Sequence, residues 1–424
     1  MDFRTDRDTP ELPENDPPAE ITESVSPDTW ARASKGWTRS PTARIALLGV
    51  AGFLAAISWQ VVIPFVPLHL SNIGFDPAQI GILASFLNLA MGIVELEVGR
   101  VAGVFGRRWT LVAGYFFNGA AMVWLAQMRT WPGVTLALAT VGSFRAMMWV
   151  PLFAEVAHTA SAQTRGRAFG TFWFWTSVAF LIGPALGGLI VSLHGTRSAF
   201  YLGSAFSVVA LPALIAATDP GRPVTQATVT GAAKVLKIPA ISRLCTANLL
   251  YYSVTGIWMT FLPLYAAQQK ISVLTIGWVF TLQGLTYALV QIPTGRLVDR
   301  LGPERLFIPA LVGRAIIAAF VPLLHSQSAF LFAGAVFGLA GGFLPVPLTT
   351  LIARLVPQEH YTTAMGVYNS SGDLGFFIGP LLGGGAALLG ILAPFFLCVP
   401  LGIAGVAVGL SGIQAAQRAD AASL

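Results

Sequence analysis

The sequence has few charged residues and almost no cysteine. Of its 424 residues, 10% are charged and 55% are hydrophobic, whereas soluble proteins carry about 25% charged residues. This composition excludes an ordinary water-soluble domain. The two cysteines, Cys245 and Cys398, both lie in apolar stretches. They therefore indicate neither a disulfide framework nor a metal site.

Motifs of catalysis and of nucleotide hydrolysis are also missing. No lysine follows a glycine, which excludes the Gly-Lys pair of a phosphate-binding loop. There is no Gly-x-Ser-x-Gly or His-Glu-x-x-His pattern, and no potassium-type filter sequence. The five histidines form no metal-ligand cluster. We therefore expect neither an enzyme nor an ATP-driven pump, and no cofactor or metal ion.

The charges are unevenly distributed along the chain. Residues 1–28 contain nine acidic residues and two arginines, a net charge of −7, so the other 396 residues carry +13. Residues 1–42 are rich in Pro, Ser, Thr and acidic residues and are predicted to be a disordered cytoplasmic tail. They have no basic start followed by an apolar core, so they are not a signal peptide. The basic balance of an apolar body favours a cytoplasmic membrane face over nucleic-acid binding.

From residue 44 onward, apolar runs recur that are long enough to cross about 30 Å of hydrocarbon as helices. They predict an all-α integral membrane protein with twelve transmembrane helices. The predicted spans are 44–70, 78–99, 108–128, 132–156, 168–193, 198–218, 243–267, 273–295, 306–325, 329–353, 363–389 and 393–415.

These spans predict two bundles of six helices, at residues 43–218 and 243–415, joined by a cytoplasmic linker at 219–242. Residues 416–424 are predicted to form a second cytoplasmic tail. Lys and Arg concentrate in the loops on one side, which the positive-inside rule places in the cytoplasm. We therefore expect a multi-pass inner-membrane protein with both termini cytoplasmic.

An internal repeat supports two pseudo-symmetric halves. Positions 196 residues apart carry the same residue type at many places, without a gap. Matching pairs include Pro67 and Pro263, Gly81 and Gly277, Gly99 and Gly295, Gly106 and Gly302, and Pro151 and Pro347. Two halves of the same topology imply a pseudo-twofold axis along the membrane normal, with a central site between them.

The loops after the second and eighth spans carry related motifs. The loop after the eighth span contains Gly295, Asp299, Arg300, Gly302 and Arg305. This resembles the signature of the major facilitator superfamily of secondary transporters, in which glycine, aspartate, arginine and glycine are followed by basic residues, and the resemblance covers residues 44–415.

The counterpart in the first half carries Gly99, Gly106, Arg107 and Arg108. It departs from the family because Gly103 and Val104 replace the aspartate and arginine. The family's aspartate helps to latch the two halves together. Glu95 or Glu97, one to two turns earlier, is the candidate replacement.

A glycine-proline pattern in the fifth and eleventh spans also resembles the family, and in the fifth span it resembles drug/proton antiporters. Small residues four apart let helices approach closely, and proline bends a helix. The positions are Gly183, Pro184, Gly187, Gly188, Gly375, Gly379, Pro380, Gly383 and Gly384. This resemblance favours export.

Ionisable residues at membrane depth are costly and mark functional sites. Arg145 lies near the middle of the fourth span and Asp373 about ten residues into the eleventh. Arg145 could bind an anionic group or hold a carboxylate ionised, and Asp373 could carry a proton. Packing roles are the alternatives, with Asp373 paired to Arg145 or Arg314. Glu155, at the end of the fourth span, is expected to form a structural ion pair with a loop arginine.

Polar side chains within the spans supply further candidates for contacts with the substrate or proton. The set is Gln60, Asn248, Tyr252, Gln283 and Asn369. For any single one of them, packing between helices is the alternative. The first span contains no acidic residue, which leaves the identity of the coupling ion open.

These features predict a monomeric secondary transporter working by alternating access, with a small-molecule substrate and protons as coupling ion. Export of a small amphipathic or drug-like molecule is the first interpretation. Proton-coupled uptake of a small organic anion, sugar or other nutrient is the second, since Arg145 suits an anion. A membrane receptor or scaffold without net flux is the alternative from another class.

Overall fold

The computed structural model describes residues 40–160, 164–218, 232–357 and 360–422. Most of the predicted acidic tail and residues 219–231 of the predicted linker lie outside the described residues. The described residues form helices and connecting turns, with no strand among them. They fall into two groups, which we call the first and second helix groups.

The first helix group ends at residue 217. Its elements are α2 (Pro41–Gln60), η2 (Ile63–Phe65), α3 (Val66–Asn72), α4 (Pro77–Phe105), α5 (Arg107–Gln127), α6 (Trp131–Thr159), α7 (Arg165–His194) and α8 (Arg197–Ala217). The second helix group follows the short helix α9 (Ala232–Leu236). Its elements are α10 (Pro239–Gln268), α11 (Val273–Leu301), α12 (Pro303–Ala319), η3 (Val321–Leu323), α13 (Gln327–Gly342), α14 (Pro345–Leu355), α15 (Tyr361–Ala387) and α16 (Ala393–Ala422).

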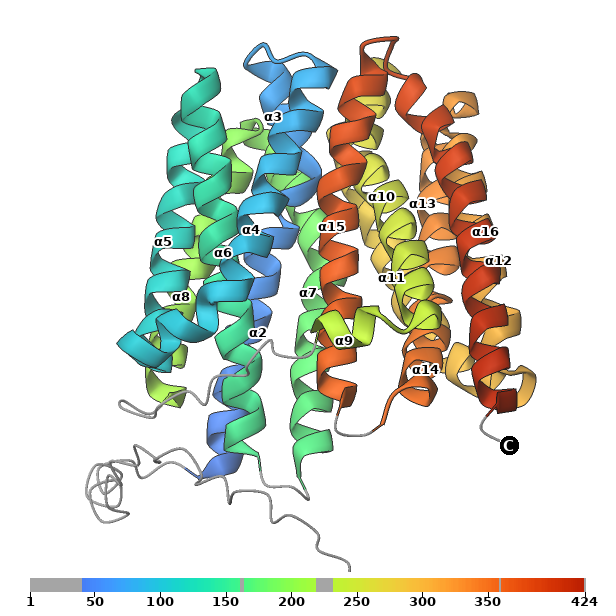
Figure 1. Cartoon of the computed structure of the whole chain (residues 1–424). Coiled ribbons are helices and arrows are strands. Elements are labelled where there is room, and N and C mark those ends of the chain that lie inside the picture. The colour runs from blue at the N-terminus through green and yellow to red at the C-terminus, as the bar shows by residue number, and fades with distance from the viewer. Residues whose placement is uncertain (1–39, 161–163, 219–231, 358–359, 423–424) are drawn as a thin grey trace, which may run out of the picture. The chain divides into compact units, whose positions relative to one another are not determined.

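Among the described residues, nine helical segments are long and apolar enough to cross a membrane. The helices α10, α12 and α15 are not among these nine, but they pack against them, α10 and α12 on α16 and α15 on α4 (Figure 1). The two helix groups meet where α4 packs on α15 and where α7 packs on α11. We call the two ends of the helices the Gly106 end, where α4 turns into α5, and the Gly195 end, where α7 turns into α8.

Two predicted spans are broken rather than continuous. The span predicted at 44–70 becomes α2, η2 and α3, and the span predicted at 329–353 becomes α13 and α14. Pro64 follows the end of α2, and Pro345 begins α14. Proline has no backbone N–H and clashes with the preceding turn, so these residues interrupt the hydrogen-bonded ladder.

Several helices continue beyond the predicted spans. The helix α4 extends to Phe105 instead of residue 99, and α11 to Leu301 instead of residue 295. Likewise α10 begins at Pro239, inside the predicted linker 219–242, and α16 runs into the predicted tail 416–424. An apolar window marks the part of a helix that suits lipid, whereas a helix itself ends only at a capping or breaking residue.

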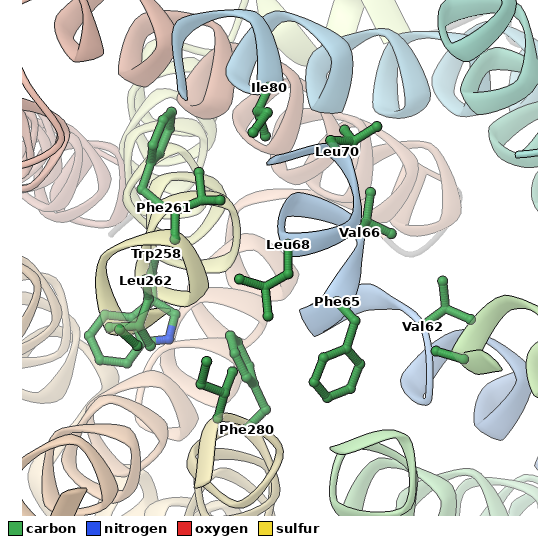
Figure 2. Close-up of a cluster of buried hydrophobic side chains, with 14 of the residues drawn as sticks. Val62, Phe65, Val66, Leu68, Leu70, Ile80, Trp258, Phe261, Leu262 and Phe280 are labelled. Atoms are coloured by element: carbon green, nitrogen blue, oxygen red, sulfur yellow. The ribbon is translucent and has the colours of Figure 1, made fainter. Parts of the chain in front are cut away.

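Among the described residues, one apolar cluster joins the two helix groups, and it lies toward the Gly195 end. A large cluster near the Gly195 end contains Phe65 and Leu68 of the first group together with Leu262 and Phe280 of the second. Figure 2 shows these side chains facing one another across the boundary. Toward the Gly106 end the core divides into two separate clusters, one within each group.

Candidate functional site

Three ionisable residues from three helices form the centre of the candidate site. Glu95 of α4 and Asp373 of α15 lie close enough for their carboxyl groups to interact with each other. Two ionised carboxylates this close repel, so the pair favours holding one proton between them. Arg145 of α6 lies close enough to interact with the charge of both. We call these three residues the carboxyl–arginine centre.

Arg145 is contacted by an aromatic ring and by a sulfur atom. Its guanidinium lies over the ring of Trp59 from α2, 4.4 Å from the ring centroid. Its Nη1 donates to the sulfur of Met91 at 3.6 Å. Its Nε is buried and has no hydrogen-bond partner among the described residues. The arginine therefore keeps donor capacity beyond what its neighbours use.

The second arginine within the helices belongs to a different site. Arg314 of α12 is 4% exposed, and its Nη1 donates to the Tyr251 hydroxyl. The guanidinium lies over the rings of Tyr251 and Phe337, at 4.5 and 4.1 Å from their centroids. Of the two arginines proposed to pair with Asp373, Arg145 is the one whose charge acts on it, and no ion pair joins the two side chains among the described residues.

Two predicted polar candidates are engaged within the second helix group. The Asn248 amide donates to the Tyr368 carbonyl at 3.2 Å and to the Ser371 hydroxyl at 2.9 Å, which ties α10 to α15. Gln283 accepts from the Trp258 indole N–H at 2.9 Å. These contacts are the packing roles that the sequence left as the alternative.

The other three candidates lie on α2, α10 and α15. Tyr252 interacts with Tyr368 and packs on Phe376, with ring centroids 5.1 Å apart. Gln60 packs against Gly183 at the end of α2, and Asn369 is exposed one turn before Asp373. Among the described residues, none of these three forms a hydrogen bond with the carboxyl–arginine centre.

The loop motifs lie at helix ends and single-residue turns. Gly106 and Gly302 separate α4 from α5 and α11 from α12, with φ of +79° and +83°. Gly99 and Gly295 are within α4 and α11, where an added Cβ would meet nothing within 4 Å. The remaining motif residues of the second group, Asp299, Arg300 and Arg305, are exposed.

The first motif anchors a buried ion-pair network at the Gly106 end. Arg107, 3% exposed, donates to one Glu155 oxygen at 3.0 Å, and Arg44 donates to the other at 3.1 Å. Arg44 also donates to the Ala217 carbonyl at 2.9 Å. The predicted ion pair between Glu155 and a loop arginine is therefore confirmed, and it joins four helices.

The glycine-proline motifs make close helix contacts between the two groups. A Cβ on Gly81 of α4 would lie 2.5 Å from the Pro380 carbonyl oxygen of α15. A Cβ on Gly277 of α11 would lie 2.5 Å from the Pro184 carbonyl oxygen of α7. Gly384 and Gly188 complete the two contacts. Both α7 and α15 continue through their prolines.

Other motif glycines pack within their own groups. Gly187 meets Val61 and Phe65, and Gly383 meets Phe261. Gly375 and Gly379 lie against the backbone of α10. These positions have no room for a side chain, which explains why small residues recur there.

The sequence did not place Glu95 at the centre of the site. The predicted span stopped at residue 99, which put Glu95 near the membrane surface. Because α4 continues to Phe105, Glu95 lies deeper in the helix. The 196-residue repeat gave no signal for this pairing, since Glu95 corresponds to Gln291 and Asp373 to Ser177. At these positions, acidic side chains occur where α4 meets α15 and not where α7 meets α11.

Long apolar helices with a half-buried ionisable centre between them are typical of a multi-pass membrane protein of the transporter class. A family model described as the Major Facilitator Superfamily matches residues 48–269 and again residues 244–420. The chain therefore belongs to this superfamily.

Three known proteins illustrate the similarity. The multidrug resistance protein MdtG of Citrobacter koseri is 27% identical over 390 residues, covering 87% of this chain and 92% of that protein. A multi-drug resistance efflux pump PmrA homolog of Lactococcus lactis is 24% identical, covering 79% and 86%. The crystal structure of the nucleoside transporter NupG superposes with a TM-score of 0.73 at 16% identity, covering 88% and 98%.

Proposed function

We propose that the protein is a proton-coupled exporter of small amphipathic or drug-like molecules, with twelve transmembrane helices in two six-helix halves. The observation that carries the proposal is the carboxyl–arginine centre, which lies where α4 meets α15. The halves are the bundles predicted at 43–218 and 243–415. Their symmetry is supported by the contacts of Gly81 with Pro380 and of Gly277 with Pro184, which are related by the 196-residue repeat.

The Gly106 end is the cytoplasmic end in this proposal. Most loop arginines and lysines lie there, whereas the Gly195 end has Arg129, Arg197 and Lys270. The apolar cluster that joins the two groups near the Gly195 end supports a state closed toward the outside. Separate clusters toward the Gly106 end support a state in which the two groups part on the cytoplasmic side.

The carboxyl–arginine centre supplies the coupling. In this proposal Glu95 and Asp373 share one proton, so that the pair carries one negative charge, which the nearby Arg145 balances. Loss of that proton leaves two carboxylates facing one arginine, and like charges this close repel. Protonation thus favours the α4–α15 contact, and deprotonation weakens it. Binding energy at this contact can drive a rocking motion of one half against the other.

The export direction and the substrate class are supported by similarity to MdtG and the PmrA homolog. The ring of Tyr252, which lies against Gly372 next to Asp373, suits ring-bearing compounds and cations. Uptake is the second candidate, favoured by the spare donor capacity of Arg145, which suits an anion.

The test uses inside-out vesicles that contain the protein, a pH-sensitive dye and a panel of lipophilic cations, organic anions and sugars. We expect lipophilic cations to dissipate an imposed acid-inside gradient only when the protein is present. Asp373→Asn should abolish this response. Asp76→Asn is the matched control, because Asp76 is an exposed N-cap residue and asparagine also caps helices.

Two results would contradict the proposal. Proton movement that is unchanged in the Asp373→Asn protein would remove the carboxyl–arginine centre from the coupling. Proton uptake into right-side-out vesicles together with an organic anion or sugar, without a response to cations, would establish import instead.

A further inference from the structure

A polar pocket at the Gly195 end lies away from the carboxyl–arginine centre. Its volume is about 450 Å³, and it lies where α3, α5, α7 and α8 approach one another. Its lining residues are His69, Asn72, Ile73, Arg129, His194, Gly195, Thr196 and Arg197. Two arginines and two histidines line it and no acidic residue does. We call it the Arg129–Arg197 pocket.

The two arginines are not neutralised within the described part of the chain. Neither Arg129 nor Arg197 belongs to any of the ion pairs found there. Both side chains are exposed. Two guanidinium groups that line one concave surface without a carboxylate create a field that attracts anions.

The pocket lining includes the start of α8, whose first turn has no side-chain cap. His69 is 1% exposed, and its Nδ1 lies 3.0 Å from the Thr196 hydroxyl oxygen. Thr196 is the N-cap residue of α8, yet its side chain makes no bond to the first turn of that helix. The contact with His69 therefore directs the hydroxyl away from capping. The Ser198 N–H donates to the Gly195 carbonyl at 3.2 Å, and no side chain caps the first turn of this 21-residue helix, whose start lines the basic pocket.

The other helix group shows that the fold does not require this basic pocket. The residues 196 positions later than His69, Arg129, Thr196 and Arg197 are Tyr265, His325, Leu392 and Ala393. No arginine or lysine occupies these equivalent positions. The Tyr265 hydroxyl donates to the Pro322 carbonyl at 3.0 Å, a contact between neighbouring helices. The basic residues of the first group are thus an addition to a shared framework.

We propose that the Arg129–Arg197 pocket binds a phosphate-bearing anion of headgroup size. Guanidinium groups pair with phosphate oxygens in a fork geometry, and uncapped helix N-termini bind phosphate through backbone N–H groups. A volume of about 450 Å³ exceeds what a single water or halide ion fills and is typical of small-molecule pockets. The phosphate comes either from a phospholipid headgroup of the adjoining leaflet or from a free anion in solution.

The experiment uses the purified full-length chain and two probes. In the first arm, equilibrium dialysis in detergent measures the binding of radiolabelled inorganic phosphate at fixed ionic strength. In the second arm, native mass spectrometry measures how much phosphatidylglycerol the protein retains from nanodiscs that contain equal amounts of phosphatidylglycerol and phosphatidylethanolamine. Neither arm depends on transport or on the sidedness proposed above.

Arg129→Gln/Arg197→Gln is the test variant, and Lys270→Gln is the matched control. Lys270 is a basic residue at the same end of the second group and does not line the pocket. We expect saturable binding in at least one arm, weakened about tenfold or more in the test variant and unchanged in the control. A response in the phosphate arm identifies a soluble anion, and a response in the lipid arm alone identifies the headgroup.

Equal binding by the test variant and the original chain in both arms would overturn the proposal, as would the absence of saturable binding in both. The thermal unfolding midpoint of each variant checks that it is folded. The single variants Arg129→Gln and Arg197→Gln carry the same test if the double variant unfolds, because each removes one of the two cations.

Discussion

Gly81 of α4 and Gly384 of α15 meet backbone to backbone: a Cβ on Gly81 would lie 2.6 Å from the Gly384 Cα. The equivalent pair in the repeat, Gly277 and Gly188, makes the same kind of contact between α11 and α7. These two contacts lie in the helix pairs α4–α15 and α7–α11, through which the two helix groups pack on each other. The one between α4 and α15 also positions Glu95 beside Asp373.

Substitution of Gly81 should separate these two helices. We expect Gly81→Ala to lower stability by about 1–3 kcal/mol, because the added methyl group overlaps backbone atoms that cannot rotate away. Transport should fall with it. Gly92→Ala is the matched control on the same helix, since a Cβ there meets nothing within 4 Å. That change should be neutral or stabilise by up to about 1 kcal/mol.

Thermal unfolding in detergent and transport in vesicles measure both effects. If Gly81→Ala and Gly92→Ala behave alike in both assays, the close contact with α15 is not required.

Neutralisation of Glu95 should uncouple transport from the proton gradient. A glutamine at position 95 cannot exchange a proton, and its amide can donate to the Asp373 carboxylate, so Glu95→Gln imitates the state in which the pair shares one proton. We expect gradient-driven export to fall about tenfold or more, while exchange of substrate across the membrane without a gradient continues. Transport should also lose its dependence on pH.

The matched control is Glu97→Gln. Glu97 is two residues away, its side chain is 54% exposed and it pairs with Arg100 at 2.9 Å. Vesicle assays with and without an imposed gradient compare the two variants. A Glu95→Gln protein that still concentrates substrate against the gradient would show that Glu95 plays no part in coupling.

The sequence predicted the outline of the helices better than their ends. Apolar windows located the long helices, because lipid requires about 20 apolar residues in each span. They missed the continuation of α4 to Phe105 and the breaks at Pro64 and Pro345. Helix ends depend on local backbone geometry and on residues outside the lipid, which hydropathy does not register.

The same limit explains which site residues the sequence could predict. Arg145 and Asp373 were evident because charges in apolar runs are costly. Glu95 was judged by its distance from the predicted end of a span, and its partner Asp373 is 278 residues away in sequence. A pairing between helices so far apart depends on tertiary packing. The 196-residue repeat predicts equivalence between the halves but not which helix faces which.

Loss of Glu155 should destabilise the first helix group. Its two oxygens accept from Arg107 and Arg44 in a buried environment. Glu155→Gln leaves Arg107 without a charged partner, and removal of one member of a buried pair costs about 3–5 kcal/mol. Glu97→Gln again serves as control, since exposed pairs contribute about 0–1 kcal/mol. Unfolding midpoints in detergent should separate the two variants, and equal midpoints would show that the network does not stabilise the fold.

The turn between α4 and α5 requires glycine for its backbone conformation rather than for space. Gly106 has φ +79° and ψ 148°, a region that residues with a Cβ avoid, and a Cβ there would meet nothing within 4 Å. Gly106→Ala should therefore cost about 1–3 kcal/mol through backbone strain alone. Gly99→Ala is the matched control, because Gly99 lies inside α4 with the same open surroundings and alanine favours a helix by up to about 1 kcal/mol. Thermal unfolding in detergent should move in opposite directions for the two variants. A Gly106→Ala protein as stable as Gly99→Ala would mean that the turn adopts another conformation in solution.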